Sequence, residues 1–419
     1  MGSPATPLKD TTIIGAGLAG LTLALALHHE GIPVTVYESR PAPLNIGGAV
    51  MLSPNALKIF DAYGLYDVIK TKGYNFEHLE YRTVEGKLVD TYDFGSQAKY
   101  GYPGLRIYRY ILIDTLVEAL AARNIPVVYG KKFSHVVSDT PEDEGVTFAL
   151  TDGTEHKTSL LIGADGIHST VRKHLYPDLK TTFIGMAGIT AAVPTSALEL
   201  PADYHLPATI MSPKGAFVIA PQEVDGSEVL IGKQMRVTPH ETSGAAWERE
   251  FVADKQSGVA FLQSGNEHFP PFVQRAVDQI TSTDKVNKWP FFVVPPLERW
   301  TSQTRRVLIL GDAAHAIPPS AGQGINQAFE DVYMLALLLG QKKRIGEDKL
   351  ADALAFWQEY RQQRINRIMV LNKEIDQRRM PSNDAVGEAV EERGQGYNLE
   401  WLYKPDFKQV VEEWLQKHA

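Results

Sequence analysis

The sequence predicts an α/β protein: a parallel sheet with helices, a smaller antiparallel-sheet domain and C-terminal helices. Three observations predict this fold. A β-branched run, a glycine-rich turn and a helical run follow one another near the N-terminus. Alternating strand-like runs separated by turn residues fill the middle of the chain, and long helical patterns fill its last quarter. A chain of 419 residues is long enough for two or three such units.

Composition excludes several classes of protein. Lys and Arg number 42 against 50 for Asp and Glu, so the net charge of −8 disfavours nucleic acid and anionic membranes as partners. The absence of cysteine excludes disulfides, thiolate nucleophiles, Cys-ligated zinc and iron–sulfur clusters. The apolar stretch Thr12–Leu27 lacks the flanks of a signal peptide, and Tyr333–Leu339 is too short to cross a bilayer. We therefore expect a soluble, cytoplasmic chain with a small-molecule partner.

The first part of the chain reads as a β-α-β unit. Thr11–Ile14 is a buried parallel strand, Leu18–Glu30 is a helix and Val34–Glu38 is the second strand. We expect further helices at Asn55–Tyr63 and Arg109–Arg123, and further strands at Pro126–Tyr129, Val146–Leu150 and Leu160–Gly163.

From about Thr181 the pattern changes to strands that are more plausibly antiparallel than parallel. These strands are Thr181–Val193, Ala208–Ser212, Ala216–Pro221 and Glu228–Arg236. A buried strand at Arg306–Leu310, helices at Gln323–Gly340, Asp348–Arg379 and Pro405–Lys417, and a polar linker at Asn383–Gln395 are expected after them. The helix Asp348–Arg379 mixes arginines with acids, which predicts a solvated, ion-paired face.

Gly15, Gly17 and Gly20 form a GxGxxG motif between the first strand and the first helix. Gly15 permits the tight turn, Gly17 lets the backbone approach a pyrophosphate, and Gly20 lets helix and sheet pack closely. The helix N-terminus offers N–H groups and a positive dipole end to that phosphate. Glu38, at the end of the second strand, can accept hydrogen bonds from ribose hydroxyls. The motif predicts NAD or FAD, and the alternative is a tight turn that binds nothing.

A second glycine-rich segment, Gly311–Asn326, follows the strand Arg306–Leu310. A strand that ends in Gly-Asp can present the Asp312 carboxylate to a polyol. The glycine-rich turn after it begins a helix and directs N–H donors and a dipole toward a ligand, and at the pyrimidine end of a flavin they would stabilise negative charge. The alternative is a structural turn in which Asp312 caps a helix.

A third motif, Gly163-Ala-Asp165-Gly166-Ile-His-Ser169-Thr-Val-Arg172, lies between these two. With the three motifs in order, each at a strand end, the chain resembles the class A FAD-dependent monooxygenases over most of Thr11–Gly340. This family includes aromatic hydroxylases of the para-hydroxybenzoate and salicylate type and flavin enzymes that inactivate tetracyclines. The resemblance implies a Rossmann-type FAD-binding domain in two parts, 1–178 and 291–345, around a substrate-binding sheet domain, 179–290, with C-terminal helices at 346–419.

The resemblance also implies a role for individual residues. Glu38 would hold the adenosine ribose, Asp312 the ribityl chain, and Asp165 either FAD or the nicotinamide cofactor. A plain salt bridge between Asp165 and Arg172 is the alternative. The loop Ile46–Val50 would run past the flavin ring. The implied cofactor-binding residues are Gly15, Gly17, Gly20, Glu38, Ala49, Arg109, Asp165, Asp312, Gly322, Gly324, Ile325 and Asn326.

The chemistry implied by the resemblance resides in the flavin. NADPH or NADH would reduce FAD, O₂ would add to give a C4a-hydroperoxyflavin, and its distal oxygen would attack an aromatic or polycyclic molecule, tetracycline-like or another secondary metabolite. The cofactor carries such chemistry while the protein supplies position and a dry pocket, so we assign no catalytic side chain and no metal. The sequence leaves the oligomeric state, monomer or dimer, open.

Substrate contacts are expected in the middle sheet and the loop at Pro318. The candidates are Thr190, Met211, Phe217, Gln234, Phe291 and Pro318, with core packing as the alternative for each aromatic. Many aromatic hydroxylases of this class carry Trp-Arg in the strand that matches Gly188–Val193, where this chain has Thr190. A clamping arginine is missing there, which disfavours simple aromatic acids and favours larger polycyclic substrates. His205 and His315 are expected at the surface or in supporting positions.

Other functions are compatible with the same motifs. Baeyer–Villiger oxygenation, epoxidation, dehydrogenation and halogenation use related flavin proteins, although the WxWxIP signature of flavin halogenases is absent. The fold also supports non-catalytic proteins that chaperone prenylated GTPases, and these lack a full flavin site. Bound flavin would separate the enzymes from the binding proteins.

Overall fold

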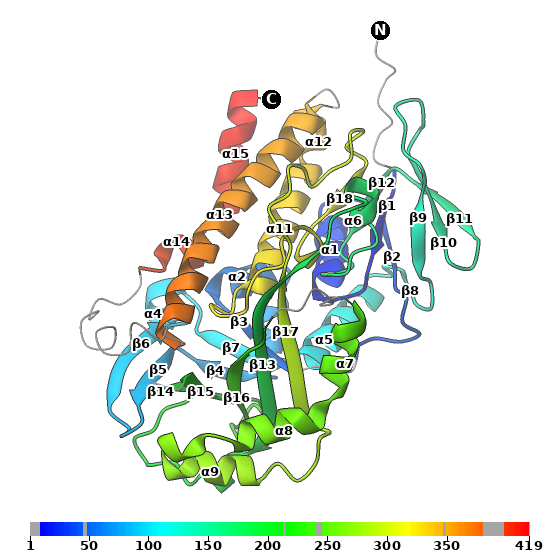
Figure 1. Ribbon diagram of the computed structural model, residues 1–419. Coiled ribbons are helices and arrows are strands. Elements are labelled where there is room, and N and C mark those ends of the chain that lie inside the picture. The colour runs from blue at the N-terminus through cyan, green and yellow to red at the C-terminus, as the bar shows by residue number, and fades with distance from the viewer. Residues whose placement is uncertain are drawn as a thin grey trace.

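The computed structural model describes residues 9–44, 48–212, 215–238, 245–346, 349–379 and 398–418. Within these residues the predicted α/β fold class is confirmed (Figure 1). The whole predicted linker Asn383–Gln395 lies outside the described residues.

The parallel sheet has five strands in the order β18-β12-β1-β2-β8. These are β18 (Val307–Ile309), β12 (Leu160–Gly163), β1 (Thr11–Ile14), β2 (Val34–Tyr37) and β8 (Val127–Val128). Every neighbouring pair is parallel, and Ile14, Gly163 and Ile309 stand side by side in the register. Because parallel strands end at the same edge of a sheet, the three glycine-containing motifs that follow β1, β12 and β18 all begin there.

Helices surround this sheet. The helix α1 (Leu18–His29) is buried over nearly its whole circumference, as expected for a helix that is apolar on all sides. It packs against α5 (Arg109–Ala121) and α11 (Gly324–Gly340), and α11 in turn contacts α2 (Pro54–Ala62), α13 (Leu350–Arg379) and α15 (Phe407–His418). Shorter helices are α3 (Tyr66–Ile69), α4 (Gln97–Tyr100), α6 (Arg172–Leu175), α10 (Asp312–His315), α12 (Lys342–Ile345) and α14 (Glu400–Tyr403).

The larger sheet has seven strands in the order β17-β13-β16-β15-β14-β5-β6. These are β17 (Val286–Val293), β13 (Thr182–Pro194), β16 (Glu228–Arg236), β15 (Gly215–Pro221), β14 (Ala208–Ser212), β5 (His78–Thr83) and β6 (Leu88–Asp93). All neighbours are antiparallel except β14 and β5. The sheet therefore takes two strands from before residue 179, and β17 crosses residue 290, so its limits differ from the expected 179–290.

Three helices that the sequence analysis did not predict cover one face of this sheet: α7 (Ala245–Ala253), α8 (Lys255–Gln263) and α9 (Pro271–Asp278), at the bottom of Figure 1. The amphipathic helix α9 begins at a proline and buries Phe272, Val273, Ala276 and Val277. These side chains pack with alternate residues of the strands, such as Ile189, Phe217 and Ile231.

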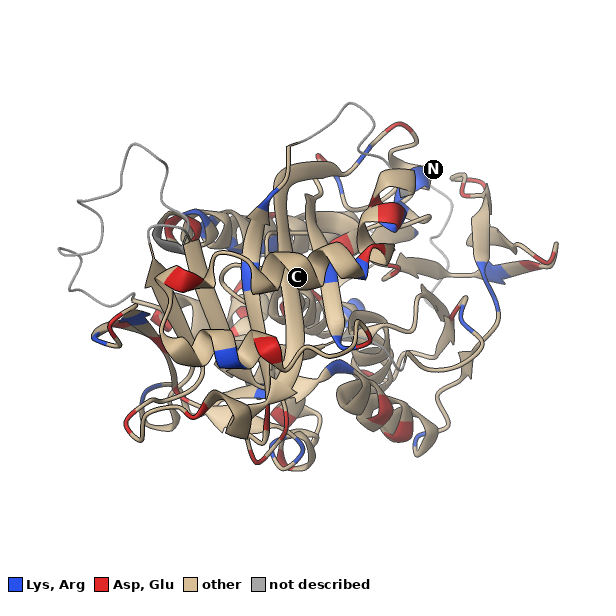
Figure 2. Cartoon of the chain, turned by 60° about the horizontal axis from the view of Figure 1, so that its bottom comes forward, with Lys and Arg blue, Asp and Glu red and all other residues tan. Residues whose placement is uncertain are grey.

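Two smaller sheets complete the fold. In one, β3 (Ala49–Leu52), β7 (Gly104–Tyr108) and β4 (Tyr74–Phe76) are antiparallel in the order β3-β7-β4. In the other, β9 (Phe133–Ser138), β10 (Val146–Leu150) and β11 (Glu155–Thr158) form a projecting meander at the right of Figure 1. No helix among the described residues is long and apolar enough to cross a membrane. Acidic and basic residues are interspersed over the side drawn in Figure 2.

The long helix α13 departs from the expected solvated face. Arg361 and Arg364 are buried, and they pair with Glu330 on α11. A helix face with arginines at this spacing can bury them when a neighbouring helix supplies acids. The acids on α13 itself are not the partners of these two arginines.

Candidate functional site

The three motifs meet at one edge of the parallel sheet, as the strand order requires. A Cβ added at Gly15 would lie 2.6 Å from the carbonyl oxygen of Ala164, and the backbone N–H of Leu310 donates to the carbonyl of Gly163 at 3.1 Å. The turns after β1, β12 and β18 are thus in direct contact. Their side chains and N–H groups can act on one ligand.

The first glycine turn combines two tight positions with one open position. A Cβ at Gly20 would lie 1.9 Å from the carbonyl oxygen of Gly15, so Gly20 is required by packing. A Cβ at Gly17 would meet no atom within 4 Å. Gly17 is the N-cap of α1 and no side chain caps this helix, so its first N–H groups remain available to an anion.

The Glu38 carboxylate is bonded to the backbone of this turn. Its Oε2 accepts a hydrogen bond from the backbone N–H of Ala16 at 2.8 Å, and its Oε1 accepts from Arg40 Nε at 3.0 Å. Burial raises the pKa of Glu38, but the hydrogen bonds and charge of Arg40 and the Ala16 N–H outweigh it, and the net pKa is lowered. Glu38 is therefore a fixed carboxylate beside the glycine turn, as its predicted role requires.

Arg109 and Asp312 lie close enough to shift each other's pKa. Burial raises the pKa of Asp312, while the positive charges of His315 and Arg109 lower it, and the net shift is upward. Burial likewise lowers the pKa of Arg109, and Asp312 opposes that shift. Both side chains are exposed to solvent although protein surrounds them, which is expected of groups that line a recess. The structure therefore brings Arg109, predicted to contact the cofactor, close to Asp312, predicted to hold the ribityl chain.

The segment Gly322–Asn326 forms the start of α11. Gly324 begins the helix, no side chain caps it, and a Cβ at Gly324 would meet no atom within 4 Å. The half-buried Ile325 follows in its first turn. This helix end offers unpaired N–H groups and a positive dipole, which is the arrangement predicted for the pyrimidine end of a flavin.

The side chain of Asn326 has a structural use. Its Oδ1 accepts from the Ser53 N–H at 3.0 Å, and its Nδ2 donates to the carbonyls of Met51 at 3.0 Å and Gly322 at 2.7 Å. Asn326 thereby fixes β3 against the α11 turn. On β3, Ala49 stands opposite Tyr108, next to Arg109, while Ile46 and Gly47 of the predicted loop lie outside the described residues.

Asp165 and Arg172 do not form the plain salt bridge that was the alternative. Asp165 Oδ2 accepts from the backbone N–H groups of Thr170 and Val171, and Oδ1 is buried without a partner. Arg172 donates to the carbonyls of Ala313, at 2.8 Å, and Ile167, at 2.6 Å. Arg172 therefore ties the turn after β12 to α10, the helix that begins at Asp312.

The predicted substrate residues divide between the two faces of the seven-stranded sheet. Cross-strand pairing places Gly188 beside Gln234 and Met211 beside Ala216, and Thr190 lies on this same face. The face is opposite the one that α8 and α9 cover. The Gln234 Oε1 is buried there without a hydrogen-bond partner. Polar atoms left in this condition are uncommon in folded proteins and mark candidate ligand contacts.

The prediction that Phe217 contacts the substrate is wrong, because this residue lies on the other face of the sheet. It is fully buried among Ile189, Ile210 and Phe269, beneath the helices that cover the sheet. Alternate residues of a strand point to opposite faces, so Phe217 and Ala216 cannot both face the substrate. Phe217 is a core residue.

Apolar side chains connect the open face to the α11 turn. Met211 and Ile317 pack in one cluster with Met51, Phe94 and Ala321. Pro318, next to Ile317, is buried at this boundary, and the ring of the buried Phe291 lies 3.4 Å from where a Cβ of Gly188 would be. Except for Phe217, the predicted substrate residues therefore lie on or beside the face that points toward the cofactor turns.

Comparison with known proteins adds the family. The model of the FAD binding domain family matches residues 9–370. The chain belongs to this family. It is 30% identical to the 3-amino-4-hydroxybenzoate 2-monooxygenase of Streptomyces cremeus, over 77% of this chain and 76% of the relative. It is 27% identical to the 6-hydroxynicotinate 3-monooxygenase of Pseudomonas fluorescens, over 85% and 88%.

Solved structures of this class share the fold. CtdE in complex with FAD and a substrate superposes with a TM-score of 0.77 at 20% identity, covering 97% of this chain and 98% of CtdE. HpxO of Klebsiella pneumoniae, complexed with FAD and uric acid, gives 0.73 at 22% identity, covering 97% and 96%. The chain is thus an FAD-dependent monooxygenase of the class A group, and NAD(P)H and O₂ are the usual co-substrates of the family.

A buried network that was not predicted from the sequence supports the turn that bears Asp312. Asp331 on α11 accepts from the Gly311 N–H at 3.0 Å and from His315 Nε2 at 2.5 Å, and its other oxygen accepts from Arg361. His315 is therefore buried in a supporting position behind Asp312. The acids Glu330 and Asp331 on a predicted helix and the arginines on a later helix were visible, but nothing local paired them. Trp289, more than half exposed beside Gly188, was also missed.

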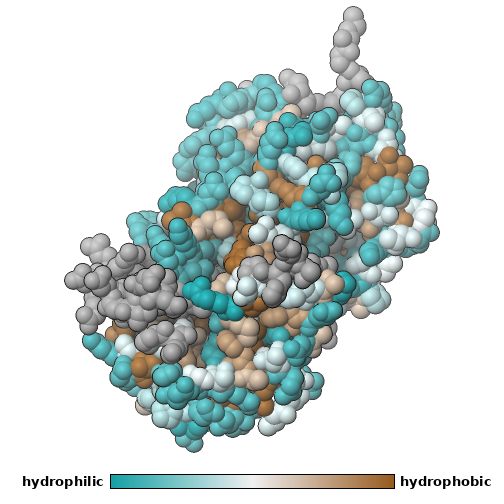
Figure 3. Space-filling model, in the orientation of Figure 1, coloured by the Kyte–Doolittle hydropathy of each residue, from teal (hydrophilic) through white to brown (hydrophobic). Residues whose placement is uncertain are grey.

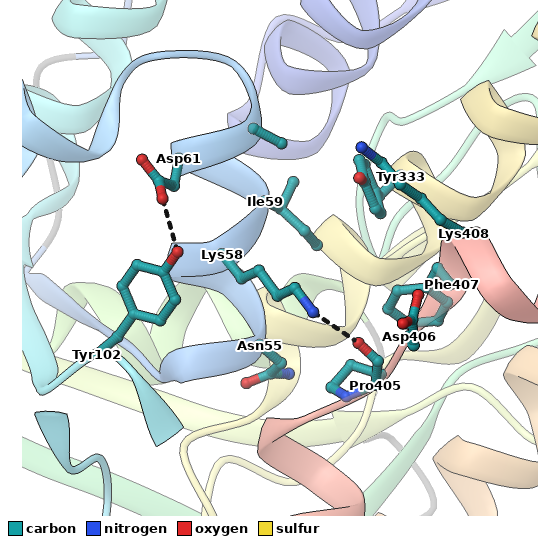
Figure 4. Close-up of a pocket in the computed structure, with 11 residues that line it drawn as sticks. Asn55, Lys58, Ile59, Asp61, Tyr102, Tyr333, Pro405, Asp406, Phe407 and Lys408 are labelled. Carbon is teal, nitrogen blue, oxygen red and sulfur yellow. Dashed lines mark hydrogen bonds between the residues drawn. The ribbon is translucent and has the colours of Figure 1, made fainter. Parts of the chain in front are cut away.

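A pocket of about 350 Å³ lies elsewhere, between α2 and the start of α15. Figure 4 shows Lys58 reaching the Pro405 carbonyl, 3.4 Å away, and Asp61 facing the hydroxyl of Tyr102, 2.6 Å away. None of the predicted cofactor or substrate residues lines it. Figure 3 shows a mostly hydrophilic surface with hydrophobic patches, some of them among hydrophilic residues in the lower half of the view.

Proposed function

We propose that this monooxygenase uses NADPH or NADH and O₂ to hydroxylate an aromatic ring held between the open face of the seven-stranded sheet and the N-terminus of α11. The observation that carries the proposal is the apolar cluster that joins Met211 on that face to Met51 and to Phe94, whose ring lies 3.1 Å from where a Cβ of Gly322 would be, beside the start of α11. The Gln234 Oε1, buried without a hydrogen-bond partner, lies on the same face. FAD, when bound, supplies electron transfer from the nicotinamide and activation of O₂.

The chain's own residues bind and orient. The uncapped turn at Gly17 would take the pyrophosphate, Glu38 the adenosine ribose, and Asp312, with Arg109 facing it, the ribityl chain. The first N–H groups of α11 would meet the pyrimidine edge, where a positive dipole favours negative charge. The apolar cluster of Met51, Phe94, Met211 and Ile317 would exclude water from the reacting ring.

Relatives support an aromatic substrate. The names of the Streptomyces cremeus and Pseudomonas fluorescens relatives specify an aminohydroxybenzoate and a hydroxynicotinate, and a further relative, from Neonothopanus nambi, is a hispidin-3-hydroxylase. All three names describe hydroxylated aromatic compounds. Thr190 occupies the position at which many aromatic hydroxylases of this class carry a clamping arginine. Strand β13 therefore does not favour a small aromatic acid, and a polycyclic, tetracycline-like substrate is included in the proposal.

The visible spectrum of the purified protein tests this function. We expect two flavin absorption bands that bleach on anaerobic addition of NADPH or NADH and recover in air, and nicotinamide consumption that an aromatic compound accelerates. A product that gains one oxygen atom distinguishes hydroxylation from dehydrogenation. A colourless protein that takes up no added FAD would overturn the proposal and favour a binding protein.

A further inference from the structure

A buried guanidinium lies next to the proposed substrate face. Arg106 is the middle residue of β7, where it stands opposite Met51 on β3 and Tyr74 on β4. Its neighbours Leu105 and Ile107 point into the core of the FAD-binding part. Because alternate side chains of a strand point to opposite faces, Arg106 points away from that core. Its side chain crosses to the seven-stranded sheet, where Nη2 donates to the Gln222 Oε1 at 2.8 Å.

Arg106 has an incomplete set of partners. Only 5% of the residue is exposed, its Nε is buried without an acceptor, and no carboxylate among the described residues lies within 4.0 Å of its nitrogens. Burial lowers the pKa of Arg106 to about 10, with only Tyr108 opposing the shift, so the group stays charged at neutral pH. A buried charge without a counter-charge is unfavourable by several kcal/mol.

A second buried arginine shows what a completed site looks like in this protein. Arg82 on β5 is 6% exposed, almost the same as Arg106. Its Nε donates to the Glu80 carboxylate at 2.6 Å, and its Nη atoms donate to the carbonyls of Gly86 and Asp203. Arg82 is therefore paired with a carboxylate, and each of its three nitrogens has an acceptor in the chain, whereas the Nε of Arg106 has none.

The neighbours of Arg106 connect it to the proposed site. Met51 and Tyr74 belong to the apolar cluster that also contains Met211 and Ile317. The carbonyl of Met51 accepts from Asn326, whose amide also bonds Gly322 in the α11 turn. Arg106 thus lies in the layer between the cofactor turns and the sheet face, and Gln222, held on its other side by the Tyr108 hydroxyl, turns its oxygen to Arg106.

We propose that Arg106 binds the carboxylate of the substrate, so that the substrate class is an aromatic acid. This inference rests on the proposed function and names the charge of the ring compound that the site takes. A guanidinium presents parallel N–H donors that match a carboxylate, and the buried position makes the pair selective against neutral analogues. The substrate carboxylate would supply the counter-charge that the chain does not provide. It also changes the expectation from Thr190, because the arginine missing from β13 is supplied by β7.

Binding to the FAD-loaded protein tests the inference. The probes are 4-hydroxybenzoate and 6-hydroxynicotinate, each paired with its primary amide, titrated calorimetrically and by perturbation of the flavin spectrum. We expect the wild type to bind at least one acid about tenfold or more tightly than its amide, the range of a charge-assisted hydrogen bond. The variant Arg106→Met should lose that preference, and Arg82→Met, the matched control, should keep it.

Thermal denaturation of the substrate-free holoenzyme supplies a readout independent of turnover. Arg106→Met should leave the Tm unchanged or raise it, because it removes an uncompensated charge. Arg82→Met should lower the Tm, because it leaves Glu80 buried without a partner. An Arg106→Met variant that loses as much Tm as Arg82→Met would show that the charge is structural and would overturn the inference.

The outcomes separate this inference from the proposed function. A wild type that prefers neither acid over its amide, or a preference that survives Arg106→Met, overturns the role of Arg106 even if neutral phenols accelerate NADPH consumption. A protein that takes up no FAD, or whose nicotinamide consumption no aromatic compound accelerates, overturns the proposed function itself.

Discussion

Arg361 on α13 donates from Nε to Oδ1 of Asp331 on α11 at 2.7 Å, and neither side chain is exposed. The same carboxylate holds the Gly311 N–H and His315 through its other oxygen. One acid therefore links α13 to the turn that presents Asp312. The pair is fully desolvated, so its charges depend on each other.

Breaking this pair should destabilise the protein strongly. Arg361→Met leaves Glu330 and Asp331 buried with one fewer cation, and we expect the free energy of unfolding to fall by about 3–5 kcal/mol. Urea denaturation at neutral pH measures it. Arg367→Met, at an exposed position over the Trp401 ring, is the control and should change stability by about 1 kcal/mol or less. Equal losses in the two variants would contradict a stabilising role for the buried pair.

The same acids should make the fold sensitive to low pH. Burial raises the pKa values of Glu330 and Asp331, but their cationic partners outweigh it and the net pKa values are lowered from 4.5 and 3.8. A lowered pKa contributes stability that is present above the unfolded pKa and is lost as the pH falls through the folded pKa. We expect the free energy of unfolding to decline below pH 4.5, with a shallower decline in Asp331→Asn. An unchanged decline in that variant would exclude Asp331 as a cause.

Asp312 should make stability depend on pH with the opposite sign. The protein that surrounds its recess desolvates the Asp312 carboxylate and raises its pKa, so the ionised form is less favourable in the fold and stability is lost as the pH rises through the folded pKa. Asp312→Asn should therefore raise the Tm of the FAD-free protein at pH 7. It should also weaken FAD binding by about tenfold or more, because a charge-assisted hydrogen bond to the ribityl chain is lost. Flavin fluorescence titration measures the affinity, and unchanged FAD affinity would contradict the ribityl role.

Substitutions at two glycines of the first motif, Gly17 and Gly20, should have different effects. Gly20→Ala places a Cβ within 1.9 Å of the Gly15 carbonyl oxygen, so we expect a lower Tm with or without FAD. Gly17→Ala places its Cβ in open space, so the apoprotein should retain its Tm while FAD affinity falls. Differential scanning fluorimetry with and without FAD separates the two. Normal FAD affinity in Gly17→Ala would show that no phosphate approaches that position.

Substitutions on the two faces of the large sheet should have contrasting effects on stability. Phe217→Ala should lower the free energy of unfolding by about 3–5 kcal/mol, the usual result of truncating a buried aromatic. Gln234→Ala removes a buried amide whose oxygen has no partner, so stability should change little while KM for the substrate changes. Unfolding curves and steady-state kinetics check the pair. A large stability loss in Gln234→Ala would assign it to packing.

The first glycine turn could be predicted from the sequence, because the constraints on it come from residues that are close together in the chain. Gly15 and Gly20 are required by the geometry of a single strand–turn–helix unit, so six consecutive residues are enough to identify it. Phe217 could not be placed from sequence, because its strand is apolar on both faces and periodicity does not say which face the helices cover. The burial of Arg361 could not be predicted either. The sequence of an arginine-rich helix face is the same whether that face meets water or meets acids on a helix 30 residues earlier in the chain. Strands β5 and β6 join the sheet through non-local pairing with β14.

The position of β18 bears on how the protein is made. This strand supplies an edge of the parallel sheet from residues 307–309, beside β12, and the turn with Asp312 comes directly after it. A nascent chain shorter than that has the first two motifs but neither the last strand nor Asp312. Until β18 is made, the flank of β12 that it covers has no strand partner, and an unpaired flank of this kind is a position at which a nascent chain can pair with the wrong strand.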